Sequence, residues 1–178
     1  RPVAEQRVLV PTTPGASTGP RLAAVALARS HSLARTADGA VWSWGWGDHG
    51  WLGHGDDKNQ PPKKVQALAG QRVVAVSAGA RHSLALTADG AVWSWGSGDE
   101  EGQLGHGDEQ RQLLPKKIEA FAGQRVVAVS AGSCHGIAIT ADGAVCAWGE
   151  GRHGGLGRGE DVSDQLLPKK VEAWAPGQ

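Results

Sequence analysis

The 178-residue chain lacks methionine, has only two cysteines and one phenylalanine, and carries no net charge. Lysine plus arginine equal aspartate plus glutamate at 18 each, so no overall field attracts the chain to nucleic acid or acidic lipid. No apolar run approaches the length of a membrane span, and no signal-peptide pattern opens the sequence. We therefore expect no membrane partner and no direct contact with nucleic acid.

The scarcity of cysteine argues against a disulfide framework. Asp142-Gly143, taken as a two-residue hairpin turn, places Cys146 opposite Ile139 and away from Cys134. A disulfide between the two cysteines is then not expected, which favours a reducing, intracellular compartment, either cytoplasmic or nuclear. Because the chain begins at Arg1 and has no methionine, we expect it to be a processed or partial piece of something longer.

A repeat of about 52 residues dominates what is present. Three copies share the string Ala-Asp-Gly-Ala-Val, and their marker histidines lie 51 and 53 residues apart, at His31, His82 and His135. A fixed period in this range indicates stacked supersecondary units, each unable to bury its apolar face alone. The 27 glycines, with plentiful valine, leucine and tryptophan, favour short strands joined by tight turns.

Each copy is predicted to form four β-strands. In the second copy a short apolar strand over 73–77 precedes an alternating run over 82–87, and 88–90 closes a hairpin into 91–95. Asp-Gly between alternating runs is a strong hairpin signal, because both turn residues need positive φ. A glycine-rich loop over 102–108 then leads to a strand that begins with proline and two lysines. Proline and lysine are typical of exposed edges, so the repeat predicts a four-stranded propeller blade.

These motifs together resemble the RCC1 (regulator of chromosome condensation) repeat. The resemblance rests on Gly-x-x-His-Ser-Leu-Ala-Leu-Thr-x-x-Gly-x-Val-Trp-x-Trp-Gly, followed by Gly-Gln-Leu-Gly-His-Gly, and covers nearly the whole chain from Gly19. Among members of the family, the sequence most resembles the RCC1-like domains of HERC-type proteins. The resemblance implies an all-β fold, an RCC1-like β-propeller segment of three four-stranded antiparallel blades.

The family resemblance also implies a seven-bladed ring, of which this chain holds three blades. The expected division is a preceding outer strand and Pro/Thr/Gly linker over 1–18, followed by blades over 19–69, 70–122 and 123–178. Three blades cannot close such a ring. Either the chain is part of a longer propeller, or copies of it complete a ring by association. An open arc leaves apolar blade faces bare, and such faces seek partners.

Several motifs match catalytic or metal-binding patterns by letter only. Gly45-x-Gly47-x-x-Gly50 fits the dinucleotide fingerprint, but no helix follows whose N-terminus could hold a pyrophosphate. The marker histidines belong to different blades, too far apart to share one ion with bonds of about 2 Å. We interpret them as buried side chains bonded to the backbone of their own blade. Cys134 and His135 are neighbours on a strand and point to opposite faces. We expect no catalytic residue, no metal and no cofactor.

Positions that differ among the copies are the better candidates for binding. Trp46 and Trp51 occupy a loop where the other copies have serine, glutamine, glutamate or glycine, so the fold does not require an aromatic there. They lie beside Asp48 and His49, and tryptophan near a charged rim is common at protein interfaces. The alternative is that both tryptophans cover a weakened first blade. Arg152 is a further candidate for charge-assisted contacts, with a solvated loop as the alternative.

Several functions remain open at this level. The preferred interpretation is a non-enzymatic protein–protein interaction scaffold, an RCC1-like piece of a larger protein or assembly, whose partner is another protein or further blades. Guanine-nucleotide exchange on a small GTPase, the activity that names the family, is an alternative, although no long insertion interrupts the repeats. An architectural subunit of a ciliary or ribonucleoprotein assembly is another. The family also includes a plant ultraviolet photoreceptor, but its sensory Gly-Trp-Arg-His-Thr motif corresponds here to Gly79-Ala80-Arg81-His82-Ser83, without the tryptophan.

Overall fold

Three four-stranded antiparallel sheets make up the protein in a computed structural model, which describes residues 19–98 and 101–174. Blade 1 comprises β1 (Leu22–Leu27), β2 (His31–Thr36), β3 (Val41–Gly45) and β4 (Gln60–Lys64). Blade 2 comprises β5 (Val73–Ala78), β6 (His82–Thr87), β7 (Val92–Gly96) and β8 (Gln112–Lys117). Blade 3 comprises β9 (Val126–Ala131), β10 (His135–Thr140), β11 (Val145–Gly149) and β12 (Gln165–Lys170).

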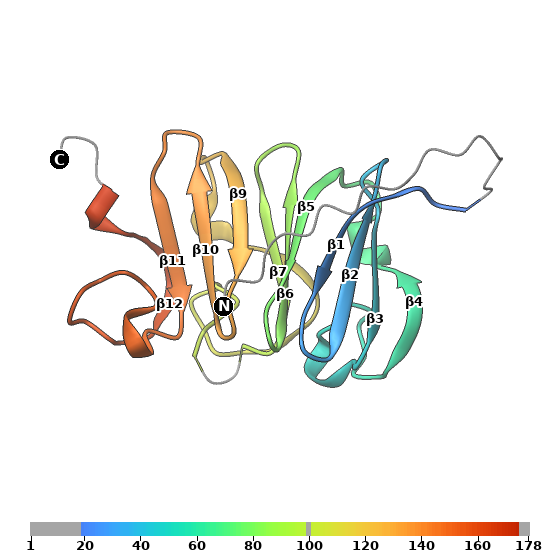
Figure 1. Cartoon of the computed structure of the whole chain (residues 1–178), viewed down its shortest axis with the longest axis horizontal. Coiled ribbons are helices and arrows are strands. Elements are labelled where there is room, and N and C mark those ends of the chain that lie inside the picture. Colours follow the sequence, from blue (N-terminus) through green and yellow to red (C-terminus); the bar gives the residue numbers. More distant parts are fainter. Residues whose placement is uncertain (1–18, 99–100, 175–178) are drawn as a thin grey trace.

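The predicted all-β propeller segment is confirmed, because each sheet contains four consecutive strands in chain order. Figure 1 shows the blades side by side, with blade 1 on the right and blade 3 on the left. The segment 1–18, for which the sequence predicts a strand and a linker, lies outside the described residues. No helix in the described part of the chain is both long and apolar enough to span a membrane.

Each blade presents two different ends. At the turn face, tight turns join the second strand to the third. At the loop face, on the lower side of Figure 1, short loops join the first strand to the second and long loops join the third to the fourth. The long loops of blades 1 and 3 contain the 3₁₀ turns η1 (Asp48–Gly50) and η4 (Arg152–Gly154). Similar turns, η2 (Gln66–Leu68), η3 (Glu119–Phe121) and η5 (Glu172–Trp174), follow the outer strands.

The turn that closes each hairpin has three residues, not the two that Asp-Gly predicted. In blade 3 the register therefore places Cys146 opposite Ala138, and the predicted pairing with Ile139 is wrong. The hydroxyl of Thr140 donates to the carboxylate of Asp142 over 2.5 Å, and only the following glycine takes a positive φ, of 86°. The same threonine–aspartate bond closes the turns of blades 1 and 2. Both cysteines are free thiols, as expected.

Neighbouring blades pack through apolar cores that bury Trp95 and Trp148. The core between blades 1 and 2 contains Leu33, Val41, Val65, Leu68, Val73, Ala85 and Trp95. The core between blades 2 and 3 contains Leu84, Leu86, Val92, Ile118, Phe121, Val126, Ala138, Cys146 and Trp148. The two fully buried tryptophans donate their indole N–H to a loop carbonyl of the preceding blade, Trp95 to Trp51 and Trp148 to Gln103, both over 3.0 Å. Trp95 and Trp148 therefore each join a blade to the one before it.

Two of the three marker histidines, His31 and His82, are buried where the blades meet. His31 is 2% exposed and His82 is 0% exposed. The Nε2 of His31 lies 3.0 Å from the hydroxyl of Ser83 in the next blade, and that hydroxyl donates to the carbonyl of Trp51 over 3.0 Å. The imidazole must therefore be the donor. For His31 the predicted bond to its own blade is wrong, because the nearest acceptor belongs to blade 2.

Candidate interaction surface

A repeated backbone hydrogen bond brings the variable loop positions together. The start of each long loop donates an N–H to the adjacent short loop over 2.8–2.9 Å, in the pairs Trp46 to Ser30, Ser97 to Arg81 and Glu150 to Cys134. Because the bond occurs in every blade, the short and long loops of all three blades meet on one surface. Residues that vary among the copies are thus gathered at the loop face.

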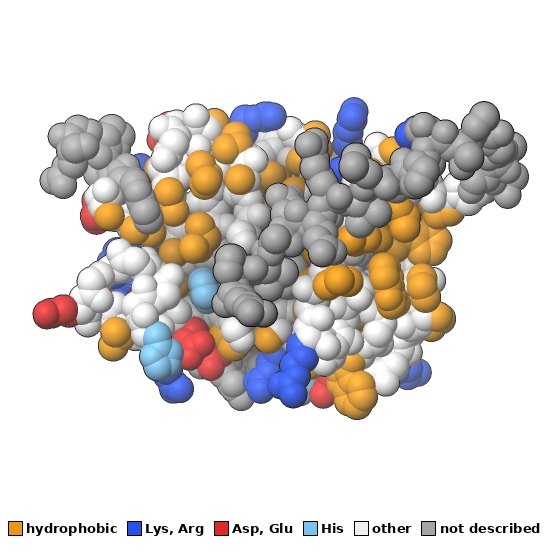
Figure 2. Space-filling model, viewed as in Figure 1, with side chains coloured by type: hydrophobic (Ala, Val, Ile, Leu, Met, Phe, Trp, Pro, Cys, Tyr) orange, Lys and Arg blue, Asp and Glu red, His pale blue; other side chains and the backbone are white. Residues whose placement is uncertain are grey.

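An open groove of about 580 Å³ runs across this face. Its lining includes side chains from all three blades: Arg29 and Trp46 from blade 1, Arg81 and Glu101 from blade 2, and Cys134 and Glu150 from blade 3. Figure 2 shows basic and acidic side chains close together along the lower edge of the molecule, where the loop face lies. We call this feature the loop-face groove.

The two candidate tryptophans have different environments. Trp46 is 51% exposed at the groove. Trp51 also lines the groove but is half-buried, and its indole N–H donates to the hydroxyl of Ser97 over 3.1 Å. Its ring lies 5.9 Å from the ring of His31, centroid to centroid. Trp51 therefore belongs to the contact between blades 1 and 2, whereas Trp46 presents its ring to solvent. A binding role for either stays a prediction.

The other three candidates lie outside the groove lining. Asp48 Oδ1 accepts from the N–H of His49 over 3.1 Å, and Asp48 Oδ2 lies 3.7 Å from His49 Nε2. His49 adopts a left-handed conformation with φ of 51°. Arg152 Nε lies 3.9 Å from Glu150 Oε1, so the predicted arginine contacts the groove through a residue that lines it. Binding by these three residues likewise stays a prediction.

The sequence interpretation missed the acidic side of the groove. A signal existed, because Glu150 is the counterpart of Trp46 and Ser97, and Glu101 belongs to the loop with one extra residue. Both carboxylates lie near the Cys134 thiol. Burial raises the pKa of that thiol most, and Glu101 and Glu150 raise it further, against the Ser133 hydroxyl and Arg81, which lower it. A thiol with a raised pKa stays protonated at neutral pH and is a poor nucleophile.

Buried serines hold the long loops of blades 1 and 2. The hydroxyl of Ser94 donates to the carbonyl of Leu104 over 2.7 Å, and His106 Nε2 lies 2.9 Å from the Ser94 hydroxyl oxygen. The serine has used its proton, so the histidine donates. Ser43 and His54 form the same arrangement in blade 1.

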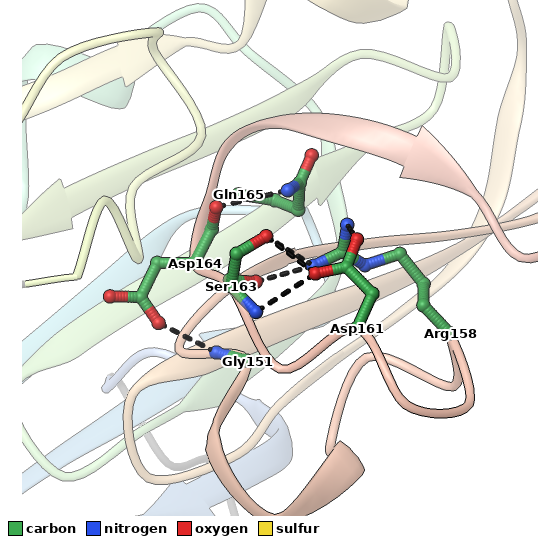
Figure 3. Close-up of polar contacts among 6 residues, drawn as sticks. All are labelled: Gly151, Arg158, Asp161, Ser163, Asp164 and Gln165. Atoms are coloured by element: carbon green, nitrogen blue, oxygen red, sulfur yellow. Dashed lines mark hydrogen bonds and ion pairs between the residues drawn. The ribbon is translucent and has the colours of Figure 1, made fainter.

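Blade 3 replaces this serine–histidine pair by Ala147 and Arg158. Figure 3 shows the result: Arg158 bonds to the carboxylate of Asp161 over 2.5 Å and to the carbonyl of Ser163. The Gly151 N–H donates to the carboxylate of Asp164 in the same loop over 2.9 Å. The two substitutions are coupled, because loss of the serine removes the partner of the histidine. In the described part of the chain, no three or more His, Cys, Asp and Glu side chains are grouped to hold a metal ion.

The lysine pairs of the outer strands have acidic neighbours. In blade 2 the hydroxyl of Thr87 lowers the pKa of Asp89 most, and the ammonium of Lys117 lowers it further. The same lysine lies 5.5 Å from the ring centre of Trp93. Blades 1 and 3 repeat the pairing of aspartate and lysine. One lysine of each pair thus interacts with a carboxylate of its own blade.

Comparisons with known proteins extend over most of the chain. A model for the Regulator of chromosome condensation (RCC1) repeat matches residues 38–86, 89–139 and 142–175, and a second RCC1 model matches 23–50, 73–103 and 126–154. The Ultraviolet-B receptor UVR8 of Arabidopsis thaliana is 43% identical over 163 residues, which cover 90% of this chain and 37% of the receptor. The human E3 ubiquitin-protein ligase HERC2 is 44% identical over 145 residues, covering 80% of this chain and 3% of the ligase.

The solved structure of Prp20p from Saccharomyces cerevisiae has the same fold. It superimposes with a TM-score of 0.75 at 25% identity, covering 85% of this chain and 38% of that one. The chain thus spans well under half the length of each of these relatives. Because both repeat models match three times, and the second matches once in each of the three sheets, the chain belongs to the family of RCC1 repeat proteins.

Proposed function

We propose that this chain is a non-enzymatic protein–protein interaction module that binds a partner through the loop-face groove. The observation that carries the proposal is the exposed ring of Trp46 beside charged side chains that differ from blade to blade. Aromatic residues surrounded by polar groups supply much of the binding energy at protein interfaces. The Prp20p structure, which is described together with binding to Gsp1p and histones, shows that a protein of this fold binds other proteins. The two free thiols support an intracellular location, cytoplasmic or nuclear.

Site-specific photo-cross-linking from position 46 tests this proposal. The matched control is position 167, where Leu167 is exposed on the outer strand β12. We expect a partner to cross-link at position 46 only, and to bind the Trp46→Ala variant at least tenfold more weakly when purified. Because Trp46 is largely exposed, the variant should unfold at the same urea concentration as the parent. If position 46 cross-links only to another blade of the same ring, Trp46 is an inter-blade residue and the proposal is wrong.

Guanine-nucleotide exchange is the second candidate, favoured by the likeness to Prp20p and the Gsp1p binding named with it. Exchange predicts that the chain accelerates release of a fluorescent guanine nucleotide from a purified small GTPase, in proportion to its concentration. A release rate equal to the intrinsic one excludes it. An architectural subunit, the remaining alternative, would join its assembly through the blade faces, so Trp46→Ala would leave its incorporation unchanged.

A further inference from the structure

The charge of the loop-face groove changes sign from blade 1 to blade 3. Arg29 comes from blade 1, Arg81 and Glu101 come from blade 2, and Glu150 comes from blade 3. Charges of both signs lie close enough to Cys134 to affect its thiol, because the two glutamates and Arg81 all act on it electrostatically. Among the described residues that line the groove, two arginines and two glutamates therefore follow one another from blade 1 to blade 3, and their formal charges sum to zero.

This order selects against ligands of a single charge. A polyanion that approached Arg29 and Arg81 would be repelled by Glu101 and Glu150. A basic tail that approached the two glutamates would be repelled by the two arginines. Like charges brought together at an interface cost binding free energy and suppress the wrong partner. A ligand with both signs, separated in the same way as those of the groove, avoids both costs.

We propose that the groove binds an extended, mixed-charge peptide segment of a partner protein. Its acidic residue lies over Arg29, an apolar residue contacts Trp46, and its basic residue lies over Glu150. This inference deepens the proposed function and rests on it. It identifies the class of partner as a chain segment with acidic and basic residues at separate positions.

The size of the groove favours a segment over a folded domain. Its volume of about 580 Å³ is within the range of about 300–1,000 Å³ that is usual for small-ligand sites. The backbone carbonyls of Ser30, Arg81 and Cys134 already accept hydrogen bonds from the long loops. Recognition therefore depends on side chains, and charge order matters more than chain direction.

Arg152 provides a specific prediction of this geometry. Its Nε lies 3.9 Å from Glu150, and its side chain is 71% exposed against 25% for the glutamate. Exposed ion pairs of this kind are weak. A basic ligand residue would therefore displace Arg152 and compete with it for the carboxylate, so removal of the arginine should strengthen binding. A structural role for the pair predicts the opposite.

Fluorescence anisotropy with synthetic labelled peptides tests the inference on the full chain at low salt. One peptide has two aspartates at one end, two lysines at the other and leucine between them. A second peptide has the same composition with alternating charges. We expect the separated peptide to bind at least tenfold more tightly. Arg29→Glu and Glu150→Lys should each weaken it about tenfold, and Arg152→Gln should strengthen it about threefold. Arg72→Glu and Glu119→Lys, at the opposite end of the blades, are the charge-matched controls and should have no effect.

An all-acidic peptide adds an opposite-sign readout: Glu150→Lys should strengthen its binding, whereas Arg29→Glu should weaken it. Equal binding of the separated and alternating peptides, weaker binding by Arg152→Gln, or no peptide binding at all would each overturn the inference. If a partner cross-links at position 46 but no peptide binds, the interaction function stands and the segment is wrong. If peptides bind in the expected order but no partner cross-links, the proposed function fails.

Discussion

Acidification from pH 7 to pH 5 is expected to destabilise the protein through two histidines buried between blades. Burial lowers the pKa of His31 from 6.5 to about 4 and that of His82 from 6.5 to about 3. Because the folded pKa values are the lower ones, the unfolded chain binds more protons once the pH falls below about 6.5. The free energy of unfolding is therefore highest above that pH, and it decreases progressively as the pH falls towards the pKa values of the folded state.

The size of the effect follows from these pKa values. At pH 5 an unfolded histidine is mostly protonated and a folded one is neutral, so each contributes a loss of about 2 kcal/mol. The two histidines together reduce the free energy of unfolding by up to about 4 kcal/mol, a large part of the roughly 5–15 kcal/mol of a typical domain. The turn aspartates Asp38, Asp89 and Asp142 have pKa values lowered below 3.8, so they titrate outside this range.

Urea unfolding at pH 7 and pH 5, at constant ionic strength and followed by tryptophan fluorescence, measures the loss. His31→Gln keeps an N–H donor for Ser83 but cannot titrate, so its loss between the two pH values should be smaller by about 2 kcal/mol. His106, whose burial lowers its pKa to about 4, adds to the loss in parent and variant alike. His153→Gln, in an exposed loop, is the control and should behave as the parent. If His31→Gln loses as much stability as the parent, the burial argument is wrong.

Three further substitutions test the packing between and within blades. Trp148→Phe keeps an aromatic ring but leaves the buried carbonyl of Gln103 without its donor, which should lower the free energy of urea unfolding by about 1–3 kcal/mol. Ser94→Ala removes the partner of His106, and a double-mutant cycle with His106→Ala should give a coupling of about 1 kcal/mol. A coupling of zero would mean that the serine and histidine act independently. Gly79→Ala places a methyl carbon 2.2 Å from the buried imidazole of His82 and 2.5 Å from the backbone carbonyl oxygen of Gly132, so the thermal midpoint should fall. A midpoint equal to that of the parent would show that both groups move aside freely.

The strands could be predicted from sequence because their signals are local. Apolar alternation and a glycine in each turn indicate hairpins without reference to the rest of the chain. The length of the turn could not be predicted in the same way, since it depends on a hydrogen bond from Thr140 to Asp142 rather than on backbone preference. The partner of His31 also needed the structure, because Ser83 is 52 residues away and reaches it only when the blades pack.

The candidate site was predicted in part. Comparison of the copies singled out Trp46, whose ring is exposed, but it grouped Trp51 with it because the two are close in sequence. In space Trp51 contacts Ser97, which is the counterpart of Trp46 one blade further on. Alignment of copies identifies equivalent positions but not contacts between blades. The acidic side of the groove was missed for the same reason, because Glu150 forms part of a groove only together with residues of blade 2.

The hydrogen bond from Trp51 to Ser97 has a consequence for the evolution of the chain. Although the copies are nearly identical as strands, the long loop of blade 1 is fitted to blade 2 by this bond. Exchange of blades 2 and 3 by recombination would place the larger Glu150 where Ser97 is only 2% exposed beside the Trp51 indole. The blades are therefore not interchangeable at this contact, although their strands are nearly identical.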